Sequence, residues 1–269
     1  MSDRALRDWW EELLQVHEFA HYRDYAEDLT RREVDFLVQA LGLSGSETIL
    51  DLACGGGRHS LELARRGFTV VGLDAAAPVL AHARARATEE GLSVSFVLGD
   101  MRALPADFAG RFDAILVMNS SIGFFDDATN TAVIAGCAGA LAPTGRLLLQ
   151  CINPYQISAY LQSFRNGWYT VGPGFVLREA SFEPRNAVLS LSYRYLDAAQ
   201  GLDVAHPGDS IRLYGFPELA ALLRGAGLHP VSAFGDAVLP PEPFGEQSQW
   251  QVIVAVRDRT VDVGNADSD

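Results

Sequence analysis

The sequence predicts an α/β protein: a doubly wound, Rossmann-like seven-stranded sheet with an N-terminal helical cap and an antiparallel β lid insertion. Apolar strand segments alternate with amphipathic helical segments over residues 47–153, which favours a parallel sheet covered on both faces. A three-glycine turn follows the first apolar strand, as expected where a strand passes into a helix. After Asn153 the chain changes to aromatic, alternating runs, which are typical of antiparallel strands.

Length and charge limit the possible functions. A chain of 269 residues, 48% of them hydrophobic, can bury one substantial core. The formal charge of −13 argues against nucleic acid as a partner, because binding a phosphate backbone needs a basic surface. All 21 basic residues are arginines, which excludes a lysine Schiff base with pyridoxal phosphate and the lysine of a P-loop.

The cysteines and the N-terminal segment indicate a cytoplasmic protein. Cys54, Cys137 and Cys151 are odd in number and not at paired ligand spacings, so a reducing compartment is expected and no metal site. The start of the chain is charged and amphipathic, and no segment is apolar for long enough to span a membrane. We expect a monomer or a homodimer without a membrane partner.

Residues 1–46 are expected to form the helical cap, in two or three helical pieces. Its middle part combines aromatic and polar residues, which suits either simple packing or a flap that carries Tyr22, Tyr25 or Arg31 towards a ligand carboxylate. Both interpretations can hold at once.

The segment from Thr48 to Asp74 predicts a site for a nucleoside-bearing cofactor. Gly55, Gly56 and Gly57 let the backbone turn sharply and approach a ligand. Asp74 ends the next strand about 20 residues later, where a carboxylate can accept both hydroxyls of a ribose. On its own, this pattern suits NAD, FAD or S-adenosylmethionine.

The remaining elements complete the core and define the insertion. Residues 154–209 form the expected lid for substrate, between the core segments 47–153 and 210–257, and residues 258–269 are expected to be a disordered tail. Strands are expected at 49–52, 69–73, 94–98, 114–118, 146–152, 231–234 and 250–256, and helices between Gly57 and Gly67 and at 78–90, 130–141 and 216–226.

Two later strands end in polar residues that bear on the choice of cofactor. Asp100 and Met101 follow the third strand, where they are suited to accept from an adenine amino group and to cover its face. Asn119 follows the fourth strand.

Together these segments resemble the class I S-adenosylmethionine-dependent methyltransferases, specifically the small-molecule branch with a lid after the fifth strand. The resemblance covers about residues 47–256. It implies that S-adenosylmethionine is the cofactor, that S-adenosylhomocysteine is the product, and that the chain methylates a small molecule at N, O or C, for example in secondary metabolism.

The resemblance also assigns roles to residues. It places Asp51 near the cofactor's ammonium, Asp74 on the ribose, Asp100 and Met101 at the adenine, and Asn119 beside the reacting methyl group. The other expected cofactor contacts are Ala53, Cys54, Gly55, Gly57 and Ala75, together with Tyr25 and Arg31 of the flap. The family commonly has glycine where this chain has Ala53, and Thr144 replaces one glycine of its proline-glycine-glycine turn.

Other functions stay open at this point. Gly55, Gly57 and Asp74 would also serve a nicotinamide oxidoreductase, although Ser60 replaces the third fingerprint glycine and Asp100 would be unexplained. The fold could also serve as a cofactor-binding scaffold without methyl transfer, or catalyse another reaction, such as a cyclisation.

Candidates on the acceptor side lie in the flap and the lid. Methyl transfer from a sulfonium needs mainly alignment, and a base only if the acceptor must lose a proton. If residues 210–215 form a strand, Ser210, Arg212 and Tyr214 share one face. His206, beside Pro207 and Gly208, is expected in a loop. The candidate bases and anchors are Asn119, His17, His21, Tyr22, His206, Arg212 and Tyr214.

Overall fold

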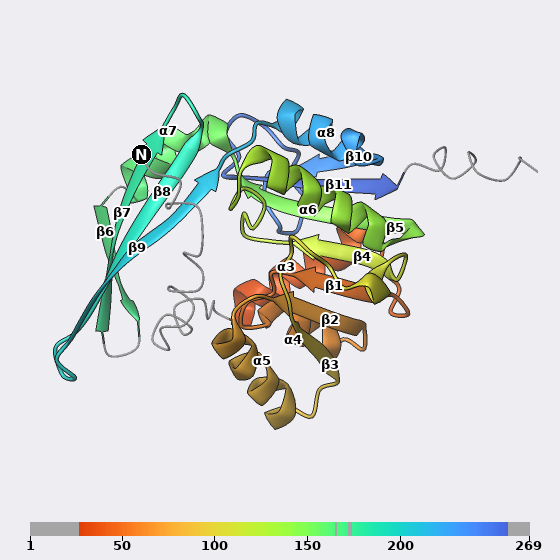
Figure 1. Ribbon diagram of the computed structural model, residues 1–269, viewed down its shortest axis with the longest axis horizontal. Helices are drawn as coiled ribbons and strands as arrows, with labels where there is room; N and C mark the ends of the chain where they lie inside the picture. The colour runs from red at the N-terminus through yellow and green to blue at the C-terminus, as the bar shows by residue number, and fades with distance from the viewer. Residues whose placement is uncertain (1–26, 165, 172–173, 258–269) are drawn as a thin grey trace, which may run out of the picture.

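The computed structural model describes residues 27–164, 166–171 and 174–257 (Figure 1). Within them, seven strands form one sheet in the order β10-β11-β5-β4-β1-β2-β3. These are β1 (Thr48–Leu52), β2 (Thr69–Asp74), β3 (Val94–Leu98), β4 (Phe112–Val117), β5 (Leu141–Ile152), β10 (Leu228–Phe234) and β11 (Trp250–Arg257). β1 to β5 are parallel, whereas β11 is antiparallel to β5 and β10. The strand order reverses between β1 and β4, which is where open α/β sheets bind ligands.

Helices cover both faces of this sheet. They are α3 (Glu27–Leu41), α4 (Arg58–Arg65), α5 (Ala77–Glu89), α6 (Asp127–Ala140) and α8 (Phe216–Gly225), with a short 3₁₀ turn at Ala106–Phe108. Leu50 and Leu52 of β1 pack in one hydrophobic cluster with residues of α6 and α8. Ile49 packs in another with residues of α3. Successive residues of a strand point to opposite faces, so β1 lies at the centre of two cores.

A second sheet is inserted after β5. The chain passes through a 3₁₀ turn (Pro154–Gln156) and α7 (Ile157–Phe164) into β6 (Asn166–Val171), β7 (Gly174–Glu183), β8 (Val188–Asp197) and β9 (Leu202–Arg212). These strands pair antiparallel in the order β6-β7-β8-β9. In Figure 1 this sheet stands beyond the end of the central sheet at which β5 leads into α7. The backbone N–H of Arg212 donates to the carbonyl of Gly123, at 2.8 Å, and so ties the end of β9 to the loop after β4.

The predicted fold class is confirmed, with local differences. The expected strand at 210–215 is wrong in its bounds: β9 runs from Leu202 to Arg212 and pairs with β8 on both sides of a register shift, so the second sheet extends past residue 209. His206 lies within β9 and not in a loop, because the strand continues through it opposite Tyr193. α7 and β6 were not predicted, since residues 157–171 lack a clear alternating pattern.

Two further expectations concern segments at the ends of the chain. Most of the N-terminal cap and the expected tail at 258–269 lie outside the described residues, so of the cap only α3 is described. No helix among the described residues is long and apolar enough to cross a membrane.

Candidate functional site

The turn between β1 and α4 has an unusual backbone. Ala53 has φ 58° and Gly55 has φ 54°, both in the left-handed region. The backbone N–H of Cys54 donates to the carbonyl of Leu73 at 3.1 Å, which holds the turn against β2. A left-handed residue with a Cβ is strained, so the common glycine of the family at Ala53 has a physical reason.

The glycines of this turn serve different purposes. A Cβ added to Gly55 would meet no heavy atom within 4 Å, so its backbone faces open space. A Cβ at Gly57 would lie 2.8 Å from the ring of Phe96. Gly57 is therefore required for packing against β3, whereas Gly55 leaves room for a ligand to reach the main chain.

Asp74 ends β2 directly beside this open turn. Its Oδ2 accepts from the backbone N–H of Gly55 at 2.7 Å, and its Oδ1 accepts from that of Ala76 at 2.9 Å. A carboxylate oxygen can accept more than one hydrogen bond, and the predicted contact of Asp74 with the hydroxyls of a ribose stays a prediction. Ala75, between Asp74 and Ala76 in the sequence, is exposed.

Asp51 lies beneath the first turn of α4. It is 2% exposed, and its Oδ2 accepts from Ser60 Oγ at 2.6 Å. Burial raises the pKa of Asp51, although the positive field of His59 and the hydrogen bond from Ser60 oppose the rise. Its predicted approach to a cofactor ammonium stays a prediction.

Asp100 is held in a fixed conformation after β3. Its Oδ1 accepts from the backbone N–H of Arg102 at 2.8 Å, and its Oδ2 accepts from Arg102 Nε at 2.8 Å. Partial burial raises the pKa of Asp100, but the bonds from Arg102 outweigh it and leave the pKa below its usual value. Met101 is buried in the main core cluster, whereas Asp100 is half-buried.

The loop after β4 begins with two residues in the left-handed conformation, Asn119 (φ 56°) and Ser120 (φ 60°). The N–H of Asn119 donates to Gln150 Oε1 at 3.2 Å, and Ser120 Oγ accepts from the N–H of Ile152 at 2.7 Å. Such strain persists where surrounding structure enforces it and is frequent at functional sites. Ser120 and Gln150 were not predicted, because their roles depend on pairing between β4 and β5 and leave no local signal.

Arg212 and Tyr214 lie together at the start of α6. Tyr214 is beyond the end of β9, so the predicted shared strand face is wrong for it. The guanidinium of Arg212 lies 4.5 Å from the ring centre of Tyr214. The hydroxyl of Tyr214 donates to Asp127 Oδ1 at 2.7 Å and accepts from Asn130 Nδ2 at 3.0 Å.

This environment keeps the phenol protonated. Burial and the hydrogen bond to Asp127 raise the pKa of Tyr214. Arg212 also donates to Glu218 Oε1 at 2.7 Å. In this arrangement both residues fix the loop after β4 against α6 and α8.

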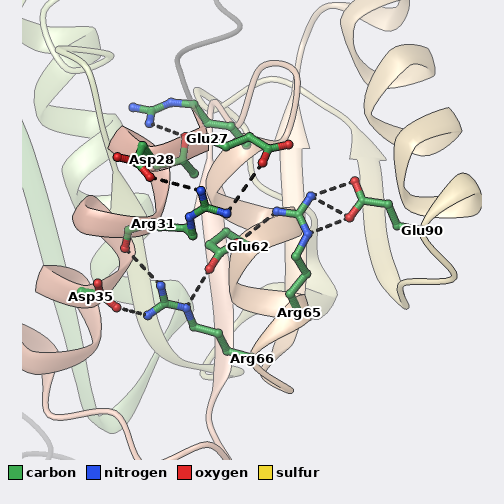
Figure 2. A network of polar contacts seen from close by, with 10 residues as sticks. Glu27, Asp28, Arg31, Asp35, Glu62, Arg65, Arg66 and Glu90 are labelled. Atoms are coloured by element: carbon green, nitrogen blue, oxygen red, sulfur yellow. Dashed lines mark hydrogen bonds and ion pairs between the residues drawn. The ribbon is translucent and has the colours of Figure 1, made fainter.

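Arg31 belongs to a polar network over α3, α4 and α5 (Figure 2). Its guanidinium is 3.1 Å from Asp28 and 3.7 Å from Glu27, and its carbonyl accepts from Arg66 at 3.0 Å. Its predicted contact with a cofactor carboxylate stays a prediction. His17, His21, Tyr22 and Tyr25 lie outside the described residues.

Among the described residues, no group of three or more His, Cys, Asp or Glu side chains is placed to hold a metal ion. Asp74, Asp100 and Asn119 each stand at or just beyond the carboxyl end of a parallel strand, and Asp51 is the penultimate residue of β1. The four strands concerned are neighbours in the order β4-β1-β2-β3.

The sequence is similar to those of known methyltransferases. A family model described as a methyltransferase domain matches residues 49–145. A glycine/sarcosine N-methyltransferase of Halorhodospira halochloris is 34% identical over 145 residues, which cover 54% of each chain. A ubiquinone biosynthesis O-methyltransferase of Xylella fastidiosa is 31% identical over 73% of this chain and 66% of its own length. The chain thus spans about half the length of the first relative and two thirds of the second.

A solved structure extends the likeness over most of the chain. An amino pentose methyltransferase from Micromonospora echinaspora, with S-adenosylmethionine bound, superimposes with a TM-score of 0.64 at 25% identity. The likeness covers 90% of this chain and 97% of that protein, so it includes the second sheet.

Proposed function

Because this chain belongs to the class I S-adenosylmethionine-dependent methyltransferases, we propose that it transfers a methyl group from that cofactor to a small molecule. The observation that carries the proposal is the antiparallel sheet inserted after β5, tied by Arg212 to the loop that begins at Asn119. This sheet stands at the end of the central sheet that carries the turn between β1 and α4, residues 53–57, which we call the cofactor turn. An acceptor between the two would face the methyl group.

The described residues fit S-adenosylmethionine. The space over Gly55 leaves room for the ligand on the main chain, and Asp74, bonded to Gly55, would accept from ribose hydroxyls. Asp100 and Met101 would bound the adenine, and buried Asp51 would attract the ammonium. When bound, the cofactor supplies an electrophilic methyl group, so the protein's share is alignment, which can lower a barrier by roughly 7–11 kcal/mol.

We favour nitrogen as the accepting atom. A neutral amine attacks without first losing a proton, so it needs little help from a base. The phenol of Tyr214, a predicted base, is occupied by Asp127 and Asn130 and held protonated. Names among the relatives support the choice: one is a glycine/sarcosine N-methyltransferase and another methylates an amino pentose.

An oxygen acceptor is the second candidate, favoured by the ubiquinone O-methyltransferase relative. A phenol or alcohol acceptor would have to pass its proton to a base. His17, His21 and Tyr22 are the candidates, and His206 on β9 is a further one.

The test has two stages. Thermal melting with S-adenosylhomocysteine, NAD and NADP comes first, because only a true ligand stabilises the fold strongly. Methyl transfer from isotope-labelled S-adenosylmethionine is then measured with amines, amino sugars and phenols. Label on nitrogen supports the proposal, label on oxygen selects the second candidate, and stabilisation by S-adenosylhomocysteine without transfer to any acceptor overturns methyl transfer to these classes in favour of a binding module.

A further inference from the structure

The first turn of α4 is fixed by two buried carboxylates. Ser60 is bonded to Asp51 of β1, as described above. The preceding two residues, Arg58 and His59, both bond to Glu33, which comes from the cap helix α3. Arg58 immediately follows Gly57, so this turn of helix is continuous with the cofactor turn.

The contacts at Glu33 are specific. Its Oε2 accepts from Arg58 Nη1 and lies 3.0 Å from His59 Nε2. Arg58 Nη1 also donates to Thr30 Oγ1 of α3 at 3.2 Å. The side chain of Glu33 is only 9% exposed, and that of His59 only 5%. Charge-assisted bonds in such a site are strong and directional.

Burial and ionisation oppose each other at Glu33. Burial raises the pKa of this carboxyl, but the hydrogen bonds from His59 and Arg58 outweigh it and leave the pKa below the usual value. Among the described residues, the buried charge of Glu33 is therefore compensated by its partners Arg58 and His59 on α4. Moving α3 away would leave Arg58 and His59 without this partner.

The same helix is anchored by apolar contacts. Val34 and Leu37 of α3 pack with Ile49 of β1, and Leu63 of α4 belongs to the same cluster. These contacts hold α3 on the sheet but do not reach the glycines. Among the described residues, Glu33 and Thr30 are what connects α3 to the start of α4.

We propose that Glu33 is a positioning residue for S-adenosylmethionine. Through Arg58 and His59, Glu33 couples the packing of α3 on α4 and the central sheet, which we call docking of α3, to the shape of the cofactor turn. The proposal rests on S-adenosylmethionine being the cofactor. Glu33 itself touches Arg58 and His59, and acts on the cofactor through them. Coupling of this kind is reciprocal: cofactor binding must stabilise docked α3 by the same factor by which docked α3 strengthens binding.

Glu62 offers a matched control. Its side chain is also 9% exposed and is bonded to two arginines, Arg65 and Arg66, and Arg66 in turn reaches Asp35 of α3 (Figure 2). Glu62 lies one turn further along α4, away from Gly57. Glu62→Gln therefore removes the charge of an equally buried carboxylate beside the arginine that contacts α3, and leaves the first turn of α4 untouched.

The test compares Glu33→Gln and Glu62→Gln with the unaltered chain by calorimetric titration with S-adenosylhomocysteine. We expect Glu33→Gln to weaken binding about 10-fold, within the usual range of coupling between sites, and Glu62→Gln to change it less than about twofold. Steady-state kinetics should show a higher KM for S-adenosylmethionine at similar kcat for Glu33→Gln. Hydrogen exchange should slow in α3 on adding S-adenosylhomocysteine, and Glu33→Gln should abolish that slowing.

Equal affinity of a folded Glu33→Gln variant, or equal losses in both variants, overturns the proposal. If Glu33→Gln does not fold, Arg58→Gln replaces it, since it removes the charged donor to Glu33 as well as the bond to Thr30. That variant should bind about three- to tenfold more weakly, and unchanged binding would overturn the proposal. Failure of the unaltered chain to bind S-adenosylhomocysteine would instead contradict the cofactor.

Discussion

The carboxylate of Asp74 accepts a 2.7 Å hydrogen bond from the backbone N–H of Gly55, so the acid at the end of β2 holds the glycine turn at the end of β1. The second oxygen holds the start of the segment leading to α5, through Ala76. The residue that the resemblance implies as the ribose acceptor thus also holds the glycine turn. Its replacement changes the turn as well as the predicted contact.

Two variants of Asp74 should therefore differ. Asp74→Asn keeps an oxygen acceptor for one backbone N–H but loses the charge, and should weaken S-adenosylhomocysteine binding about 10-fold. Asp74→Ala loses both backbone bonds and the predicted ribose contact and should weaken it about 100-fold, which is equivalent to about one bond to a charged group at 1.5–3 kcal/mol. Calorimetric titration measures both, and an affinity of Asp74→Ala equal to that of the unaltered chain would show that the ribose is bound elsewhere.

Replacing Ala53 by glycine should stabilise the fold. Its φ of 58° places an alanine in the left-handed region, at a cost of about 1–2 kcal/mol that glycine does not carry. Ala53→Gly should raise the free energy of unfolding by up to about 1 kcal/mol. Ala85→Gly, at an exposed position inside α5, is the control and should lower it by about 1 kcal/mol; chemical denaturation in which both variants lose stability would contradict the strain at Ala53.

Most of the architecture could be predicted because its signal is local. Apolar strands alternating with helices identified all the strands of the central sheet, and the glycines and Asp74 located the turn. The strain at Asn119 and Ser120 could not be read from sequence, since it depends on Gln150 one strand away. The same holds for Glu33, which is 26 positions from His59 and looks like any polar residue of an amphipathic helix. β9 was misjudged because Pro207 and Gly208 suggested a loop, yet the register shift at that point accommodates them within the strand.

Ionisation of Asp51 should lower the free energy of unfolding as the pH rises. Burial raises its pKa in the folded state above its ordinary value of 3.8, so the folded chain holds this proton more tightly than the unfolded chain. Between the ordinary pKa and the raised one, each increase in pH therefore lowers the contribution of Asp51 to stability, and the loss persists at neutral pH.

Asp51→Asn removes this loss but keeps an acceptor for Ser60. Its melting temperature should exceed that of the unaltered chain by an amount that grows above about pH 4, whereas its affinity for S-adenosylhomocysteine should fall if Asp51 faces the ammonium. Thermal melts between pH 3.5 and 7.5 check the first part, and a difference that is constant or shrinks with pH would contradict it. Unchanged affinity would remove Asp51 from the cofactor site.

Tyr214→Phe separates a positioning role from a catalytic one. The variant loses the bonds to Asp127 and Asn130, and with them about 1–2 kcal/mol of stability. Because the pKa of Tyr214 is raised, its hydroxyl stays protonated over the working pH range and cannot serve as a base there. The pH dependence of kcat should therefore keep its shape in the variant, with a modest loss of rate from a looser loop after β4. Tyr155→Phe, on a ring that is 54% exposed, is the control. A thousandfold loss of kcat in a folded Tyr214→Phe variant, together with a lost limb of the pH profile, would identify the phenol as a proton acceptor after all.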